Sequence, residues 1–529
     1  MCGIALILGP GASGDVFRAM LAALAPRGER LEVSEQPGLL AGTQRLPIVD
    51  RDHAVQPAGN GRYLLCYNGE LFNYRQLRSL LSAGPASAES PPAGPAGGDT
   101  AVLLAAFTRW GEQAVHRFRG EYAFAVAEPA AGRVYLARDP LGVKPLYWAR
   151  QDGALHVASE IKALAPLRVA VHEVPPGHHG WATAEAGPDL RPYRDPADMN
   201  PEPVEDPAEA ARLVRAAFED SVRVRVDTDL PVGVVVSGGL DSSLTLLHVR
   251  EMHSDCVAFT VGAPGSEDLH YARRLCADLG VPHEVVELSP RHIGLAAIRE
   301  AIAVSELTEY GDIINAVVSV PLFRRVREAG VKIVLTGDGS DELFGGYPMY
   351  DHAGDQARRV FLHKLAVLGR TELQRVDRTS MASTVEARVP FLDLALVELA
   401  LRLPMSLKVR DGQEKWILRE AFAGLLPGYI RLRPKNPMSH SSGLHERARL
   451  YKPLFARIHS YLGYDRCAPV RRDFSSVLEA SGHDLDLALS RAATDYSARE
   501  RVRDLAGAVR WNVAAARRPR PHRQQPGTV

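Results

Sequence analysis

The pattern of apolar and polar positions changes character near the middle of the chain. In the first half, short apolar runs bounded by turn residues predict short strands. These runs are Arg62–Tyr67, Ala123–Ala127 and Val134–Ala137. In the second half, apolar β-branched runs alternate with segments of helical spacing, which predicts a parallel sheet covered by helices. These runs are Val232–Val236, Val257–Val261 and Ile333–Leu335.

Two Pro-rich stretches interrupt these patterns. Ser82–Gly98 has no periodicity and is rich in Pro, Ala, Gly and Ser, which predicts a flexible loop. Asp189–Pro207 separates the two halves, and helical spacing begins directly after it at Ala208–Val222. We therefore expect two domains, at residues 2–190 and 205–515, followed by a disordered basic tail at residues 516–529.

Length and composition agree with two globular domains. The chain has 529 residues, of which 46% are hydrophobic, enough for two sizeable cores. Net charge is zero, and no long basic run interleaved with aromatic residues precedes the tail, which argues against a nucleic-acid partner and favours small-molecule substrates. Five cysteines do not suggest a secreted disulfide framework. With no signal-peptide pattern and no apolar stretch of membrane-spanning length, we expect a cytoplasmic protein without a membrane partner; a homodimer stays open.

The second residue is a cysteine. Removal of Met1 would leave a thiol, with a pKa of about 8.5, and a free α-amino group, with a pKa of about 8, on one residue. The amine can then take the proton of the thiol, which suits attack on an amide carbonyl. A chance cysteine is the alternative for this residue taken alone.

Further polar residues favour a site for free glutamine. Asn68-Gly69 ends a short apolar strand, and an Asn amide beside a Gly backbone N–H can donate to an oxyanion. An ordinary Asn-Gly hairpin turn is the alternative. Arg45 is available for a carboxylate and Asp99 for an ammonium, although each alone would be interpreted as a solvated surface residue.

Residues 1 to about 180 resemble the glutaminase domain of the glutamine-hydrolysing asparagine synthetase family. Ala137–Tyr147 and Ala158–Leu164 match further family segments in the same order. The resemblance implies an αββα sandwich of the N-terminal-nucleophile (Ntn) type, with Cys2 as the nucleophile. It assigns Asn68 and Gly69 to the oxyanion hole, and glutamine binding to Arg45, Asn68, Glu70 and Asp99. One loop departs from the family: Arg-His-Arg-Gly-Pro-Asp is replaced by Ala25–Arg30, which keeps only Arg27-Gly28.

The second half contains a Gly-rich loop, Ser237–Ser243, between an apolar strand and the helical stretch Leu244–Glu251. Such a loop presents backbone N–H groups and a helix N-terminus to an anion. It lacks the Lys of a Walker A loop, which favours nucleotidyl transfer with release of pyrophosphate. The loop resembles the pyrophosphate loop of the ATP pyrophosphatase superfamily, which includes the synthetase half of asparagine synthetases. A bare Gly-rich turn is the alternative.

A second loop, Thr336–Gly346, is acidic and also follows an apolar strand. Two carboxylates beside a triphosphate need a cation, so Asp241 and Asp341 are predicted Mg²⁺ ligands, as the resemblance also implies. The predicted ATP-binding residues are Val235, Ser237, Gly238, Gly239, Asp241, Ser242, Val261, Thr336 and Gly337. At position 338 this chain has Asp where the family more often has Glu, which bears on the acceptor.

Two further residues are predicted to be catalytic by the resemblance. Lys435 matches the family lysine that reaches the reacting phosphoryl and acyl groups, and only eight of the 63 basic residues are lysines. A surface lysine is the alternative. Glu309 is predicted to act on the incoming ammonia, with Glu306 as the alternative.

The predicted function is that of an ATP-dependent glutamine amidotransferase that forms an amide through an acyl-adenylate. With aspartate as acceptor, the products are asparagine, glutamate, AMP and pyrophosphate. Amidation of another acid in specialised metabolism and intramolecular, β-lactam synthetase-like amide formation are the alternatives; the latter relatives lack the N-terminal cysteine that this chain keeps. A non-enzymatic scaffold is opposed by the intact loops.

Overall fold

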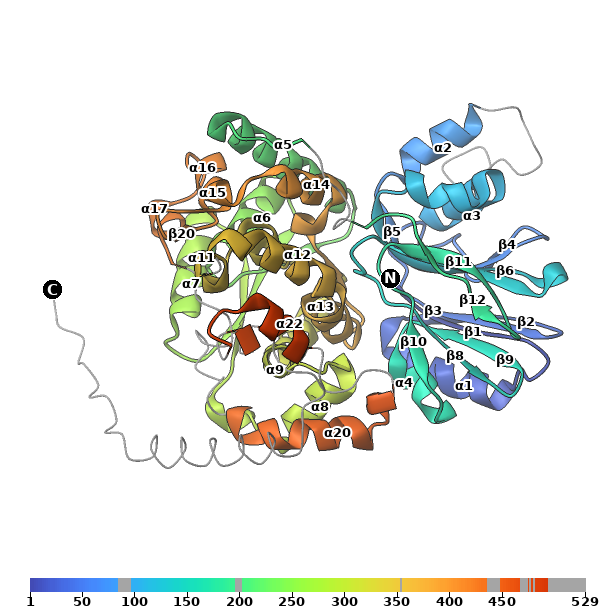
Figure 1. The fold of residues 1–529 in the computed structure, drawn as a ribbon. Coiled ribbons are helices and arrows are strands. Elements are labelled where there is room, and N and C mark those ends of the chain that lie inside the picture. The colour runs from blue at the N-terminus through green and yellow to red at the C-terminus, as the bar shows by residue number, and fades with distance from the viewer. Residues whose placement is uncertain are drawn as a thin grey trace.

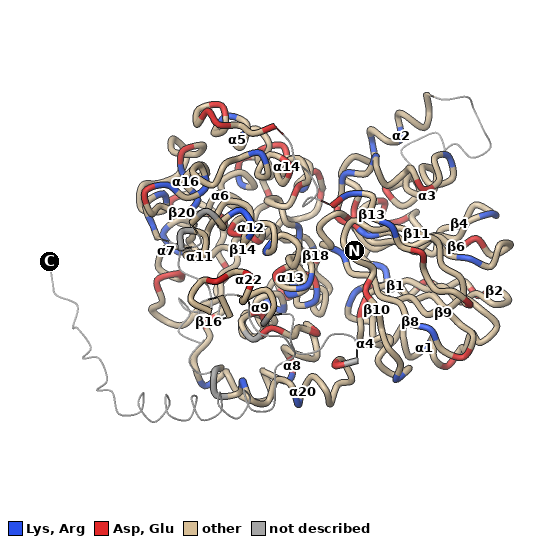
Figure 2. Tube along the Cα trace, in the orientation of Figure 1, with Lys and Arg blue, Asp and Glu red and all other residues tan. Residues whose placement is uncertain are grey.

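The computed structural model describes residues 1–83, 97–195, 202–352, 354–434, 448–466, 474, 477–478 and 481–492. Most of the predicted loop Ser82–Gly98 and the whole tail at residues 516–529 lie outside these ranges. The two halves of the chain form two bodies that lie side by side (Figure 1). Figure 2 shows basic and acidic residues interspersed over both bodies, in keeping with the zero net charge.

The N-terminal domain contains two antiparallel sheets. One has six strands in the order β10 (Val171–Glu173), β8 (Tyr147–Gln151), β9 (Ala154–Ala158), β1 (Cys2–Leu8), β3 (Leu39–Arg45) and β2 (Arg30–Gln36). The other has seven strands: β12 (Gly187–Pro188), β11 (His178–Thr183), β7 (Arg133–Arg138), β6 (Gly120–Glu128), β5 (Leu64–Leu71) and β4 (Ala58–Gly59), with β13 (Arg191–Pro192) paired to β11. Strands β5, β6 and β7 cover the three strands predicted for this half.

The two sheets stack face to face between two layers of helices. Alternate residues of β1 point to opposite faces, so Ile4 and Leu6 pack between the sheets while Ala5 and Ile7 face outward. Helices α1 (Gly14–Ala23) and α4 (Ile161–Leu164) cover the six-stranded sheet. Helices α2 (Tyr74–Ser82) and α3 (Asp99–Trp110) cover the seven-stranded sheet (Figure 1). The predicted αββα sandwich is confirmed.

The C-terminal domain is built on a five-stranded sheet in which every strand is parallel to its neighbours. The order is β16 (His283–Glu287), β15 (Cys256–Gly262), β14 (Val232–Val235), β17 (Ile333–Leu335) and β18 (Glu386–Arg388). The strand order reverses between β14 and β17, which is where open parallel sheets bind ligands, outside the carboxyl ends of the strands. The predicted parallel sheet is confirmed.

Helices surround this sheet. The longer ones are α5 (Pro207–Arg225), α6 (Leu240–Met252), α7 (Glu267–Leu279), α8 (Leu295–Ser305), α9 (Tyr310–Glu328), α12 (Ala357–Val367), α13 (Glu372–Met381) and α14 (Leu394–Arg402). Shorter elements are α10 (Ser340–Phe344), α11 (Pro348–His352), α15 (Met405–Lys408), β19 (Val409–Arg410), β20 (Gln413–Glu414), α16 (Trp416–Ala421), α17 (Gly428–Arg431), α20 (Phe455–Tyr461) and α22 (Leu485–Ala492). Helix α5 begins with Pro207 after Asp206, whose carboxylate accepts the backbone N–H of Glu209 at 2.7 Å.

The two domains share an apolar contact. Met1, Leu46, Ile48, Leu141 and Val143 of the N-terminal domain belong to the same buried cluster as the core of the C-terminal domain. Among the helices that the structure describes, none has the length and apolar character needed to cross a bilayer.

Candidate active site

Cys2 is the first residue of β1 and is buried at the domain interface. Its backbone N–H donates to Oδ1 of Asn68 at 2.9 Å. Burial raises the pKa of the Cys2 thiol, and this outweighs the lowering by the N-terminal ammonium and Arg45. The thiol is therefore protonated at neutral pH, and its attack on a carbonyl requires a base.

Asn68 and Gly69 lie on β5, opposite Cys2. The side-chain amide nitrogen of Asn68 is buried and has no hydrogen-bond acceptor among the described residues. Gly69 has a φ of +146°, and an added Cβ would collide with the carbonyl oxygen of Glu121, so only glycine fits. A buried donor left without an acceptor is costly, and a bound oxyanion would satisfy it.

Two buried charges flank the thiol. Asp99 begins α3 and accepts hydrogen bonds from the Tyr67 hydroxyl at 2.8 Å and the Leu71 N–H at 3.3 Å. Arg45 ends β3 and donates to the carbonyl oxygen of Asp50 at 3.1 Å. Both charges act on the thiol: Arg45 lowers the pKa of Cys2 and Asp99 raises it. The alternative that they are solvated surface residues is wrong, because both side chains are buried.

The sequence analysis missed Gln56. Its side-chain nitrogen lies 3.9 Å from the Cys2 sulfur, and its side-chain oxygen accepts the Tyr67 N–H at 2.9 Å. Gln56 therefore contacts the thiol. It stands in an irregular segment between β3 and β4, and no spacing pattern in the sequence marks it.

Glu70 lies at the domain interface. Its carboxylate pairs with the guanidinium of Arg388 on β18, although burial acts to raise the pKa of Glu70. Next to it, Glu386 accepts the Met1 ammonium at 2.8 Å. One wall of the thiol site thus comes from the C-terminal domain, and the assignment of Glu70 to glutamine stays a prediction.

A pocket opens at the carboxyl ends of β14 and β17. It is lined by seven residues from the predicted ATP and metal sets: Val235, Ser237, Asp241, Ser242, Thr336, Gly337 and Asp341. Gly238, Gly239 and Val261 are not among its lining residues. Gly238 has a φ of +68°, which the turn between β14 and α6 requires. Val261 is buried in β15.

Lys415, which the sequence analysis also missed, lies between the two predicted metal ligands. Its Nζ is 2.5 Å from Oδ2 of Asp241 and 2.6 Å from Oδ1 of Asp341. The two carboxylates therefore converge on one cationic position. Two carboxylates with phosphate oxygens are a usual donor set for Mg²⁺ in nucleotide sites, so the chemistry of the pair fits the ion, while the ammonium of Lys415 takes the position between the two carboxylates. Lys415 is one of the few lysines in an arginine-biased chain, which is a signal that could have found it.

The remaining predicted catalytic residues lie elsewhere. Lys435 is outside the described residues, although Arg433 nearby donates to the Ser237 carbonyl at 3.2 Å. Glu309 precedes α9, accepts the Thr308 hydroxyl at 2.5 Å and pairs with Arg370, and it is not a lining residue of the pocket. Its role in catalysis stays a prediction.

The alternative residue, Glu306, serves the interface between the domains. It accepts the backbone N–H groups of Ile161 at 3.1 Å and Lys162 at 2.7 Å. The acidic residues that do line the pocket are Asp338, Glu342 and Glu372, besides Asp241 and Asp341. The sequence analysis had singled out Asp338 but not Glu342 or Glu372.

Comparison with known proteins agrees with this division. A family model described as a glutamine amidotransferase domain matches residues 1–177, and one described as asparagine synthase matches residues 213–361 and 351–518. Asparagine synthetase B [glutamine-hydrolyzing] of Escherichia coli K12 is 33% identical over 425 residues, covering 76% of this chain and 74% of the relative. Asparagine synthetase [glutamine-hydrolyzing] of Sandersonia aurantiaca is 31% identical over 482 residues, covering 84% and 87%.

The fold and the two sites define a glutamine amidotransferase domain joined to a parallel-sheet domain with a nucleotide-type pocket. The chain belongs to the asparagine synthase family. The resemblance stated from the motifs is confirmed, and with it the class of ATP-using, glutamine-dependent ligases.

Asn68→Ala should lower the kcat of glutamine hydrolysis by about 100- to 1000-fold, because it removes one donor to the oxyanion. The KM for glutamine should rise by a smaller factor, because Asn68 is also assigned to glutamine binding. Steady-state glutamate release measures both quantities, with Asn60→Ala, in an exposed turn, as the control. A kcat within about threefold of the original chain would contradict the oxyanion role.

Proposed function

We propose that this chain hydrolyses glutamine at Cys2 and uses the ammonia to convert aspartate and ATP into asparagine, AMP and pyrophosphate. The observation that carries the proposal is the presence of two sites in one chain. One is a buried thiol beside Asn68, whose side-chain amide nitrogen has no acceptor among the described residues, and the other is a pocket where Asp241 and Asp341 converge. The printed names of the relatives, asparagine synthetase [glutamine-hydrolyzing], support aspartate as the acceptor.

In glutamine hydrolysis, removal of Met1 leaves the α-amino group of Cys2 as the base for its own thiol. That nitrogen already donates to Asn68, so it stands next to the oxyanion site. The thiolate attacks the side-chain amide of glutamine, and Asn68 and Gly69 donate to the oxyanion. The α-ammonium then gives the proton taken from the thiol to the amide nitrogen, which leaves as ammonia. Arg45, Asn68, Glu70 and Asp99 are proposed to bind the glutamine, and water then releases glutamate from the thioester.

In the C-terminal pocket, the aspartate carboxylate attacks the α-phosphorus of ATP, and pyrophosphate leaves. Mg²⁺ bound with the phosphates would neutralise their charge, and Asp241 and Asp341 are the residues that would hold it. Lys415 and Lys435 supply further positive charge. Ammonia from the thiol site then displaces AMP, with Glu309 proposed to take its proton. Ammonia is proposed to reach this pocket through a tunnel between the two domains.

A buried arginine is among the residues that line the pocket. Arg375 lines the pocket and donates to Oδ1 of Asp338 at 2.5 Å, while its Nε has no hydrogen-bond acceptor among the described residues. Guanidinium groups bind carboxylates in a planar, two-point manner. Arg375 therefore fits the second carboxylate of aspartate. Another acid stays an alternative, because Asp338 is one methylene shorter than the residue the family favours.

The proposal also includes the location and the assembly of the enzyme. We place the enzyme in the cytoplasm with small-molecule substrates, and we keep a homodimer as the proposed assembly. Light scattering of the purified chain decides the second point.

Cys2→Ala should abolish glutamine-dependent synthesis while ammonia-dependent synthesis stays near its original rate, because the thiol serves only to release ammonia. Asparagine and glutamate are measured with each nitrogen source. Cys66→Ala removes another buried thiol of the same domain and is the matched control. Unchanged glutamine hydrolysis in Cys2→Ala would overturn the assignment.

Asp241→Asn and Asp341→Asn should each remove synthesis with both nitrogen sources, since each weakens compensation of the pyrophosphate charge. Glutamine hydrolysis should persist in both variants. Asp229→Asn, in an exposed ion pair with Arg51, is the control. If the original chain forms ADP and orthophosphate instead of AMP and pyrophosphate, the adenylation mechanism is wrong.

Arg375→Lys should raise the KM for aspartate by at least about tenfold, because hydrogen bonds to a charged group contribute about 1.5–3 kcal/mol each. Pyrophosphate release is followed against aspartate concentration, with Arg358→Lys, outside the pocket lining, as the control. A chain that hydrolyses glutamine and forms AMP with another acid, but makes no asparagine, would contradict aspartate as the acceptor.

A further inference from the structure

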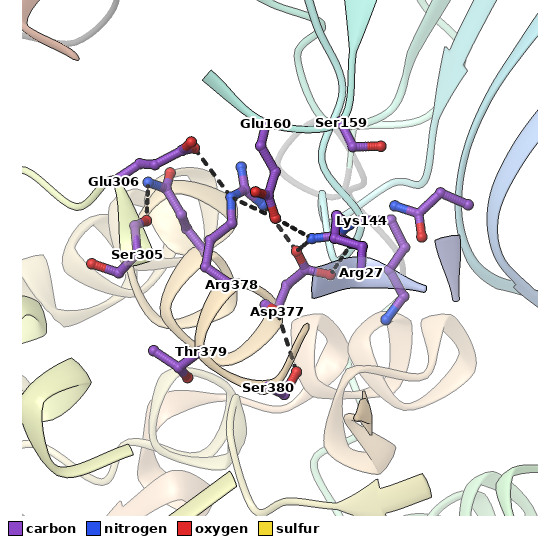
Figure 3. A network of polar contacts seen from close by, with 12 residues as sticks. Arg27, Lys144, Ser159, Glu160, Ser305, Glu306, Asp377, Arg378, Thr379 and Ser380 are labelled. Carbon is purple, nitrogen blue, oxygen red and sulfur yellow. Dashed lines mark hydrogen bonds and ion pairs between the residues drawn. The ribbon is translucent and has the colours of Figure 1, made fainter. Parts of the chain in front are cut away.

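A buried network of ion pairs crosses the domain interface next to the thiol site (Figure 3). Arg27, in the short turn Ala25–Arg27 after α1, is its member closest to Cys2. Nε of Arg27 donates to the carbonyl oxygen of Cys2 at 3.0 Å. Its Nη1 donates to Glu160 at 2.6 Å, within the same domain.

The contact to Cys2 matters because the backbone of this residue is held on both sides. Its N–H is fixed by Asn68, and its carbonyl oxygen is fixed by Arg27. Together, these two hydrogen bonds set the direction of the Cα–Cβ bond, and therefore where the sulfur and the α-nitrogen point. A shift of the Arg27 side chain would be transmitted directly to the nucleophile.

Arg27 is held in place from the other domain. Asp377 on α13 accepts Nη1 at 2.8 Å and Nη2 at 3.1 Å, which is a two-point contact. Burial would raise the pKa of Asp377, but the charges of Arg27 and Arg378 outweigh it and hold that pKa well below its usual range. Asp377 is therefore ionised at neutral pH.

The position of Asp377 is fixed by the rest of α13. Every residue from Leu373 to Met381 is buried. The guanidinium of Arg378 is fixed by Asp377 at 2.9 Å, by Glu306 at 3.2 Å and by the Tyr147 hydroxyl at 3.2 Å. On the same helix, Glu372 and Arg375 line the nucleotide pocket. Helix α13 thus contributes to the pocket, and its Asp377 also holds Arg27, the residue that contacts Cys2.

We propose that Asp377, a residue of the C-terminal domain, is a positioning residue for glutamine hydrolysis, which fixes the backbone of Cys2 through Arg27. This inference rests on the proposed function, because it concerns the rate at which the Cys2 thiol attacks glutamine. Asp377 does not touch the thiol. Its effect is on the alignment of the attacking sulfur and its base, and not on the groups proposed to bind glutamine.

Asp377→Asn in the full-length chain tests the proposal. The substitution keeps the size of the side chain and removes the charge and one acceptor of the two-point contact. The kcat of glutamine hydrolysis should fall at least about tenfold, since small misalignments of reacting groups carry large rate penalties. The KM for glutamine should stay within about twofold, and ammonia-dependent synthesis should fall much less than glutamine hydrolysis.

Asp393→Asn is the matched control. Asp393 is also buried at the domain interface and accepts Arg119 of the N-terminal domain at 3.0 Å and Arg225 at 2.9 Å. It begins α14, and Asn caps a helix as well as Asp does. Glutamine hydrolysis should be nearly unchanged in this variant. An equal loss in both variants would show a general effect of the interface and overturn the proposal.

Arg27→Lys provides a second test if Asp377→Asn does not fold. Lysine keeps a positive charge for Glu160 and Asp377 but lacks the Nε donor to Cys2. The same loss of kcat at nearly constant KM is expected. A kcat within about twofold of the original chain in a folded variant of either residue overturns the inference. If the original chain does not hydrolyse glutamine, the proposed function itself is overturned. Failure of the inference and failure of the proposed function can therefore be told apart.

Discussion

The buried ion pairs between the two domains are the constraint on which both sites depend. Arg27 with Asp377, Arg388 with Glu70, and Arg225 with Glu121 all join one domain to the other, with both partners buried. A charge removed from water must be paired, and removal of one partner of a buried pair costs about 3–5 kcal/mol. The domains therefore have one orientation in which these charges are satisfied, and a shifted orientation would leave several of them uncompensated.

This orientation makes the thiol site a product of both domains. Strand β18 ends the parallel sheet, and its residues Glu386 and Arg388 reach the N-terminus and Glu70. Lys144 of the N-terminal domain makes a further contact with this strand: it donates to Glu121 of its own domain at 3.2 Å and to the Ala387 carbonyl of β18 at 3.3 Å. The parallel sheet thus serves both sites. The nucleotide pocket lies at its switch point, and its edge strand β18 forms the wall behind Cys2.

Local sequence was sufficient for the parts of the sites that lie on one strand or in one loop. Asn68-Gly69 follows an apolar run, and Gly69 occupies a conformation that only glycine fits, so the motif is visible in the order of residues alone. The loop after β14 is equally local. Gln56 was not found, because it contacts a residue that is far away in the sequence and it lies in no motif.

The sequence by itself determined the short strands of the first half, the parallel sheet of the second half, and the Gly-rich loops with their acidic residues, because hydrophobic patterns, turns and strand-to-helix junctions are local properties. The αββα sandwich and the role of Cys2 were expected from the family resemblance. Tertiary structure decided which charges are buried and what they contact. Arg45 and Asp99 could have been solvated, Glu306 proved to join the domains, and Lys415 bridges Asp241 and Asp341. A charged side chain is well hydrated wherever it stands in an isolated chain. Only the folded arrangement, by removing water and supplying a partner, decides whether that charge serves the surface, the interface or the site.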